Sequence, residues 1–169
     1  MLTNLFTPKA VAVVGASQSP DKVGHSILKN IIDLGFEGQV YPVNPKSTEI
    51  LGKKCYPDIS ALPDGVDLVV ISIPAKFVPQ VIEECGKKHI GSAVVISAGF
   101  KEVGREGKDL ERRLENAAIM SGVRVLGPNC VGFINTSNKL NASFAADCPE
   151  PGDIAVISQS GAMCTSIID

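Results

Sequence analysis

The sequence has little net charge and no long apolar run. Its 169 residues carry a formal net charge of −2, so no global field attracts nucleic acid or an anionic membrane, and any anion site must be local. No apolar stretch approaches the roughly 20 residues of a membrane-spanning helix, and the N-terminus lacks the basic and apolar stretches of a secretory signal. These absences predict a protein that works with neither nucleic acid nor a membrane.

Potential metal ligands are also scarce. The sequence contains two histidines, and none of its five cysteines is paired in the CxxC spacing of metal sites, so we expect no metal in this chain. An odd number of cysteines is most simply explained by free thiols in a reducing compartment, which predicts a cytoplasmic protein. The residues concerned are His25, His89, Cys55, Cys85, Cys130, Cys148 and Cys164.

Short apolar segments alternate with amphipathic ones along most of the sequence. We expect helices over residues 26–34, 77–88 and 107–121, and strands over 10–15, 39–43, 67–73, 92–97 and 124–126. Strands that alternate with helices pair in parallel through right-handed crossovers. The predicted fold class is therefore α/β, with a Rossmann-like doubly wound parallel sheet. Residues 130–135 are a candidate extension of that sheet.

A linker divides the sequence near its end. Residues 149–152, PEPG, separate a domain of residues 1–148 from a final segment of residues 153–169, where we expect a strand over 153–158, a tight turn and the start of a helix. Such a strand and short helix cannot bury their apolar faces alone. We therefore expect the segment to be disordered, to dock on the first domain or to exchange between molecules. Its apolar residues, which favour self-association when exposed, are Ile154, Val156, Ile157, Met163, Ile167 and Ile168.

The ends of the predicted strands carry the candidate binding residues, because doubly wound sheets bind ligands beyond the carboxyl ends of their strands. All five ends continue into segments rich in small residues, glycine or proline. At the first end, Gly15 and Gly24 allow the backbone to approach a ligand, and the following helix offers free amides to phosphate. These glycines are nine positions apart, so the pattern is not GxGxxG. Each end alone also fits a simple turn or strand stop, but the five together predict a ligand site.

The second strand end bears on the choice of nucleotide. An NAD site has an acidic residue there, whereas this sequence has Asn44, Pro45 and Lys46, and Glu37 lies at the opposite end of the strand. A lysine suits an additional phosphate on the ribose, which favours NADP or coenzyme A (CoA) over NAD. The alternative is a solvated lysine on a turn.

Cys130, at the fifth strand end, has the chemistry of a nucleophile. No histidine lies near it in the sequence, and buried cysteines are common, so we interpret it as a structural residue. His25 and His89 are interpreted in the same way, as ordinary loop and helix-end residues.

Several motifs together resemble a known family. The segments VAVVGAS, VGHSILKN, YPVNPK, VVISAGFKEVG, VLGPNCVGFINT and AVISQSGAM are similar in order and spacing to the nucleoside-diphosphate-forming acyl-CoA synthetases. The resemblance is to the α-subunit type of ADP-forming acetate–CoA ligase, with succinyl-CoA synthetase more distant. It implies an N-terminal CoA-binding domain, a second, flavodoxin-like domain with a catalytic histidine, and an ATP-grasp region elsewhere for ADP, ATP and Mg²⁺.

The resemblance also implies a reaction. Acyl-CoA, phosphate and ADP become carboxylic acid, CoA and ATP: phosphate displaces CoA to form an acyl phosphate, and a histidine relays the phosphoryl group to the nucleotide. Neither His25 nor His89 lies in the context of that histidine. The chain is therefore expected to be part of a longer enzyme, to bind CoA or acyl-CoA, and to be inactive alone.

Residue roles follow from the resemblance, motif by motif. Lys46 is expected near the 3′-phosphate of CoA. A phosphate half-site, where a helix N-terminus binds an anion, is assigned to Ser158, Gln159, Ser160 and Gly161. The CoA-facing residues are Gly15, Ala16, Ser17, Val23 and Gly24 in the first loop, Asn44, Pro45 and Lys46 at the adenosine end, Ile73, Pro74 and Ala75 along the middle of the cofactor, Ser97, Ala98, Gly99 and Phe100 toward the pantetheine and thiol, and Asn129 and Cys130 near the thioester.

Two other functions stay open at this point. A stand-alone CoA-binding regulatory module shares the fold, but the segment after residue 152 counts against it. An NADP-dependent oxidoreductase domain is permitted by Lys46, but no hydride-transfer site is visible. Within the ligase family, a fusion to an acetyltransferase domain is a further alternative.

Overall fold

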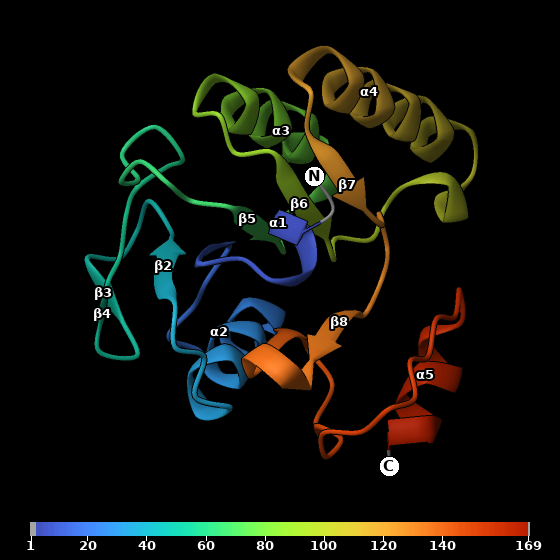
Figure 1. Cartoon of the computed structure of the whole chain (residues 1–169). Helices are drawn as coiled ribbons and strands as arrows, with labels where there is room; N and C mark the ends of the chain where they lie inside the picture. Colours follow the sequence, from blue (N-terminus) through green and yellow to red (C-terminus); the bar gives the residue numbers. More distant parts are fainter. Residues whose placement is uncertain (1–2, 169) are drawn as a thin grey trace.

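The computed structural model describes residues 3–168, which are built around a central parallel sheet (Figure 1). The strands lie in the order β2-β1-β5-β6-β7, and each neighbouring pair is parallel. This arrangement confirms the predicted doubly wound α/β fold. The strand bounds are β1 (Ala10–Val14), β2 (Gln39–Val43), β5 (Leu68–Ile71), β6 (Ser92–Val95) and β7 (Arg124–Leu126).

Helices cover both faces of the sheet, because its strands are apolar on both faces. Val11 and Val13 of β1 belong to the apolar cluster on the α2 face, whereas Ala12 and Val14 belong to the cluster on the α3–α4 face. Figure 1 shows α3 and α4 together on one side and α2 on the other. All three predicted helices are present, as α2 (Val23–Asp33), α3 (Val78–Lys87) and α4 (Arg105–Ser121).

The expected extension of the sheet by residues 130–135 is wrong. β8 (Gly132–Asn135) instead pairs antiparallel with β9 (Leu140–Ser143), and the two strands form a separate hairpin joined by η3 (Thr136–Asn138). Leu140 and Ala142 of β9 are buried in the cluster that includes α2, so the apolar face of the hairpin is satisfied by a helix instead of a strand.

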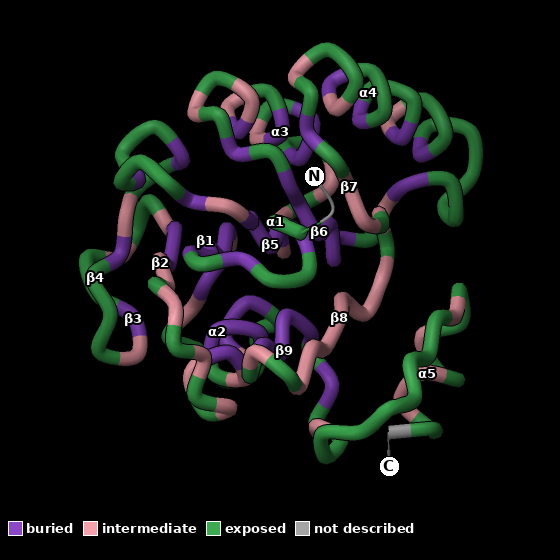
Figure 2. Tube along the Cα trace, viewed as in Figure 1, coloured by how far each residue is buried: buried purple, intermediate pink, exposed green. Residues whose placement is uncertain are grey.

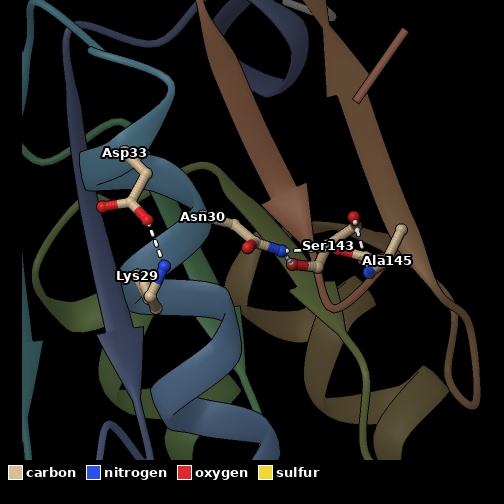
Figure 3. Close-up of polar contacts among 5 residues, drawn as sticks. All are labelled: Lys29, Asn30, Asp33, Ser143 and Ala145. Carbon is tan, nitrogen blue, oxygen red and sulfur yellow. Dashed lines mark hydrogen bonds and ion pairs between the residues drawn. The ribbon is translucent and has the colours of Figure 1, made fainter. Parts of the chain in front are cut away.

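Asn30 of α2 fixes the end of this hairpin. Its Nδ2 donates to the carbonyl oxygen of Ser143 at 3.0 Å and to that of Ala145 at 2.9 Å (Figure 3). On the same helix, Lys29, the residue before Asn30, forms an ion pair with Asp33 on the exposed side. The hairpin is therefore tied to α2 by side-chain bonds as well as by apolar packing.

The remaining elements are short and were not predicted from the sequence. None of the helices within residues 3–168 has the length and apolar character that a membrane crossing requires. The short elements are α1 (Thr3–Phe6), a hairpin of β3 (Glu49–Ile50) and β4 (Lys53–Lys54), η1 (Ala75–Phe77) before α3, and η2 (Lys101–Val103) before α4.

The final segment contains the expected helix, α5 (Gly161–Ile168), but not the expected strand. Residues 153–158 form no strand, because no described strand lies beside them to complete a ladder. Ile154 and Ile157 are 90% and 98% exposed, and Figure 2 shows the segment as mostly exposed. Asp169 and the side chain of Ile168 lie outside the described part of the chain. The domain boundary at residues 149–152 stays a prediction.

Candidate functional site

The carboxyl ends of the five strands lie along one edge of the sheet, so the strand order brings the predicted ligand loops next to one another. The order changes direction between β1 and β5, which is where doubly wound folds open a binding crevice. Each end presents at least one exposed residue of the predicted set. These residues are Val23, Lys46, Pro74, Ala98 and Asn129.

Gly15 and Gly24 hold the start of α2 against the end of β1. A Cβ atom on Gly24 would lie 1.9 Å from the carbonyl oxygen of Gly15, and one on Gly15 would lie 2.5 Å from that of Ser72. Gly15 also has a φ of +90°, which favours glycine. Contacts within the chain are thus sufficient to require both glycines. Helix α2 starts three residues earlier than expected, so Gly24 lies in its first turn.

The N-terminus of α2 is available at this edge. Lys22 is the N-cap residue, and no side chain among the described residues caps the helix. His25, in the first turn, is buried, and its Nδ1 lies 3.0 Å from the carbonyl oxygen of Ser17, so the ring fixes the first loop onto the helix. The amides of an uncapped first turn are suited to an anionic group.

The second strand end combines an exposed cation with an internally bonded amide. Lys46 is exposed, and no carboxylate in residues 3–168 lies within ion-pair distance of its Nζ. The side chain of Asn44 contacts the first loop, donating to the carbonyl oxygen of Ala16 at 2.8 Å. The predicted residues of the first and second ends are therefore connected directly.

Two aromatic rings lie beside this loop. Tyr56 forms a bridge to Val43 at the end of β2, and its ring packs edge-on against Tyr41 with centroids 5.7 Å apart. Lys54 Nζ lies 5.1 Å from the centre of the Tyr56 ring. Tyr56 was not predicted from the sequence, because it lies in the irregular segment after β4 and not at a strand end.

A series of hydrogen bonds links the other strand ends. Ser72 Oγ donates to the carbonyl oxygen of Val14 at 3.3 Å, and Ser97 Oγ accepts from the amide of Ile73 at 3.1 Å. The carbonyl oxygen of Ser97 accepts from the amide of Asn129 at 3.1 Å. Together with the bond from Asn44, these contacts join all five ends, and we call them the edge hydrogen bonds. Ser97 is buried, so its side chain serves this network and does not face a ligand.

The fourth strand end is held by a carboxylate. Glu102 Oε1 accepts from the amides of Gly99 at 2.6 Å and Phe100 at 3.1 Å. Partial desolvation raises the pKa of Glu102, but the backbone hydrogen bonds from Gly99 and Phe100 outweigh it, and the pKa is lowered overall. Phe100 is completely buried in the α3–α4 cluster, so its side chain is part of the core, and its expected place toward the pantetheine stays a prediction.

The thiol of Cys130 is turned toward the sheet. Its Sγ lies 3.4 Å from the carbonyl oxygen of Val95 and 3.9 Å from that of Leu126. Burial raises the pKa of Cys130, which disfavours the thiolate form that a nucleophile requires. This geometry supports the structural interpretation of Cys130. At the same end Asn129 has a φ of 54° and is exposed.

The predicted phosphate half-site forms the turn before α5. Ser158 Oγ accepts from the amide of Ser160 at 3.0 Å, and Ser160 Oγ accepts from the amide of Met163 at 3.3 Å, so Ser160 caps the helix. A Cβ atom on Gly161 would lie 2.6 Å from Cγ2 of Val131, which places this turn against the segment that follows the fifth strand end.

Two hollows of the described chain lie away from this edge. One, of about 510 Å³, is lined by Lys9, Gln39 and Lys139 near the amino ends of β1 and β2. The other, of about 900 Å³, lies between α3 and α4. Neither hollow is lined by a residue of the predicted set.

Comparisons with known proteins identify the family of this chain. Residues 9–136 match the model of the CoA binding domain family. The chain belongs to this family. It is 52% identical over 168 residues to the ADP-forming acetate–CoA ligase I of Archaeoglobus fulgidus, and 51% identical over 166 residues to the α subunit of ADP-forming acetate–CoA ligase I of Pyrococcus furiosus. These alignments cover 99% and 96% of the chain.

A solved structure gives the same result for the fold. The dinucleotide-forming acetyl-coenzyme A synthetase 1 of Ca. Korarchaeum cryptofilum, in complex with phosphate and ADP, is 48% identical to the chain, with a TM-score of 0.94 over 99% of it. The chain spans 24% of the A. fulgidus protein and 36% of both the P. furiosus and the Korarchaeum chains. The resemblance to the ADP-forming acetate–CoA ligases is confirmed, and neither the stand-alone module nor the oxidoreductase is supported.

Proposed function

We propose that this chain binds CoA or acyl-CoA along the carboxyl edge of its sheet, as the CoA-binding part of an ADP-forming acid–CoA ligase. The observation that carries the proposal is the 52% identity to an ADP-forming acetate–CoA ligase over 99% of the chain. The row of five neighbouring strand ends supports it, because CoA is a long ligand with separated phosphate, pantetheine and thiol groups. CoA supplies the thiol that carries the acyl group as a thioester.

The adenosine end of CoA belongs at the first and second strand ends. Lys46 is exposed and not engaged by a described carboxylate, so it is suited to the 3′-phosphate. The uncapped first turn of α2, with Val23 exposed and Gly24 in close contact with β1, is suited to the diphosphate. Gly15 and Ser17 are half-buried and would face the ligand, whereas Ala16 is fully buried and would support them from beneath.

The pantetheine and the thioester belong at the third, fourth and fifth ends. Pro74, Ala98 and Asn129 are exposed along this path, and they would contact the ligand directly. Ser97 and Phe100 are buried, and their backbone groups are bonded within the chain, so they would support the exposed residues instead of contacting the ligand. The other proposed contacts are Pro45, Ile73, Ala75, Gly99 and Cys130.

The whole enzyme would convert acyl-CoA, phosphate and ADP into carboxylic acid, CoA and ATP. Ser158, Gln159, Ser160 and Gly161 would supply half of a phosphate site at the start of α5. The relay histidine, the ATP-grasp region and the sites for ADP and Mg²⁺ would lie in residues beyond this chain, consistent with its share of the relatives' length. Its free cysteines fit a cytoplasmic location.

Calorimetric titration tests the proposal. We expect the chain to bind CoA, to bind dephospho-CoA about tenfold more weakly, since the lysine–phosphate bond is charge-assisted, and to bind NADP weakly or not at all. Lys46→Ala should remove the difference between CoA and dephospho-CoA. Lys87→Ala is a matched control, because Lys87 is an exposed lysine at the end of α3, near the amino ends of the strands. Binding of NADP without CoA would contradict the proposal.

A further inference from the structure

Asn44 connects the two loops that the proposed function assigns to the adenosine end of CoA. Its Nδ2 donates to the carbonyl oxygen of Ala16 at 2.8 Å, and its Oδ1 accepts from the amide of Lys46 at 2.9 Å. The backbone of Asn44 is also engaged: its amide donates to the carbonyl oxygen of Tyr56 at 2.8 Å, and its carbonyl oxygen lies 3.6 Å from the thiol of Cys55. The residue is therefore bonded to three different segments.

The chemistry of these partners requires a side-chain amide. A backbone carbonyl, such as that of Ala16, can only accept a hydrogen bond, and a backbone amide, such as that of Lys46, can only donate one. A carboxylate or a hydroxyl of similar size cannot satisfy both partners at this geometry. The two contacts also fix which atom of the amide is nitrogen and which is oxygen.

We propose that Asn44 is a positioning residue that sets the preference of this site for the 3′-phosphate of CoA by acting through Lys46. The proposal rests on the proposed function. Asn44 was expected from the sequence to hold the adenosine itself, but both of its side-chain groups are already bonded within the chain. A direct contact with ligand would have to compete with those bonds.

The backbone around Lys46 explains how this works. Pro45 restricts the chain before Lys46 through its fixed φ, and the Asn44 Oδ1 bond fixes the Lys46 amide. The exposed side chain of Lys46 therefore extends from a backbone that is already ordered, and less conformational entropy is lost when the phosphate binds. The bond to Ala16 also holds the second strand end in place relative to the first loop. The groups that bind the 3′-phosphate and the diphosphate would therefore stay a fixed distance apart.

A double-mutant cycle separates positioning from direct contact. The quantity to measure is the ratio of the dissociation constants of dephospho-CoA and CoA, for the wild-type chain, Asn44→Ala, Lys46→Ala and the double variant. We expect a ratio of about ten in the wild type, a several-fold lower ratio in Asn44→Ala, and a ratio near one in Lys46→Ala. Because Asn44 acts through Lys46, adding Asn44→Ala to Lys46→Ala should change the ratio no further.

Asn30→Ala is the matched control. Like Asn44, Asn30 makes two hydrogen bonds through its side chain. Both go to backbone carbonyl oxygens on the hairpin side of α2 (Figure 3). The Asn30→Ala substitution should lower the free energy of unfolding and leave the ratio of the two dissociation constants unchanged. Hydrogen exchange of the Lys46 amide provides a readout without ligand: it should become faster in Asn44→Ala and not in Asn30→Ala.

The outcomes are distinguishable. The proposal is overturned if Asn44→Ala weakens CoA and dephospho-CoA equally, if its effect on the ratio persists in the Lys46→Ala background, or if exchange at Lys46 does not change. A wild-type chain that binds CoA without preferring it to dephospho-CoA overturns the role of Asn44 and leaves CoA binding standing. A wild-type chain that does not bind CoA overturns the proposed function, and in that case the exchange of the Lys46 amide still decides whether Asn44 orders the loop.

Discussion

Gly24 lies against Gly15, with a Cβ position 1.9 Å from the Gly15 carbonyl oxygen. Gly24→Ala should therefore push the start of α2 away from β1 and lower the free energy of unfolding by about 1–3 kcal/mol, as overpacked sites do. Urea denaturation measures this. Gly91→Ala is the control, because a Cβ at Gly91 meets nothing within 4 Å. Equal stability of the two variants would contradict the close contact.

Ser97 is the buried hydroxyl of the edge hydrogen bonds. Ser97→Ala should leave the amide of Ile73 without its partner and cost about 1–3 kcal/mol, the usual penalty for an unsatisfied buried group. Ser60→Ala, at an exposed serine that bonds to Asp58, should change stability by less than about 0.5 kcal/mol. Thermal unfolding of both variants, with loss of protection at the Ile73 amide in Ser97→Ala alone, would establish the difference.

Glu102 should make the fourth strand end sensitive to acid. The pKa of Glu102 is below the ordinary value of 4.5, so the folded protein stabilises the ionised carboxylate relative to the unfolded chain. The stabilisation is present above pH 4.5 and is lost as the pH falls through the lowered pKa. Carboxyl NMR titration should report this low pKa, and Lys101→Ala should largely preserve it, since the amides of Gly99 and Phe100 remain. A Glu102 pKa at or above 4.5 would show that the amide bonds do not form.

The thiols of Cys85 and Cys130 should resist alkylation. Burial raises the pKa of Cys85 to about 12, and it also raises the pKa of Cys130. With iodoacetamide near pH 8, we expect Cys148, which is only partly buried, to react before Cys85, as followed by mass spectrometry of peptides. Rapid modification of Cys130 would instead revive its interpretation as a nucleophile.

The final segment should promote self-association of this chain. Ile154 and Ile157 are 90% and 98% exposed, so replacing both by serine should shift sedimentation velocity profiles toward the monomer. The control is the pair Ile119→Ser and Met120→Ser on α4, where two exposed apolar residues lie on a packed helix. If both pairs act equally, association reflects general surface hydrophobicity and not the final segment.

The sheet was predictable because its strands are buried on both faces, and a run such as Ala10–Val14 is apolar at every position. The hairpin of β8 and β9 was not, because Leu140–Ser143 carries two polar residues, Asn141 and Ser143, that bond to each other inside the fold. The strand expected over residues 153–158 was wrong. The segment has the composition of a strand, but no described strand lies beside it to form the hydrogen-bonded ladder.

The location of the site was predictable, but the direction of its side chains was not. Lys46 and Pro74 are exposed as expected, whereas Ser97 and Phe100, at an equally suggestive strand end, face inward. Which way a residue turns after a strand depends on the partners that the next loops bring, such as Ile73 for Ser97. Those partners are distant in sequence, so local pattern alone does not specify them.

The edge hydrogen bonds have a mechanical consequence. Asn44, Ser72 and Ser97 make each strand end share a bond with its neighbour, so a displacement at one end must strain the next. Under the proposed function, a variant selected for a bulkier acyl group would therefore gain little room by moving a single loop. It would have to gain room by trimming exposed side chains, such as that of Asn129, on a frame that stays still.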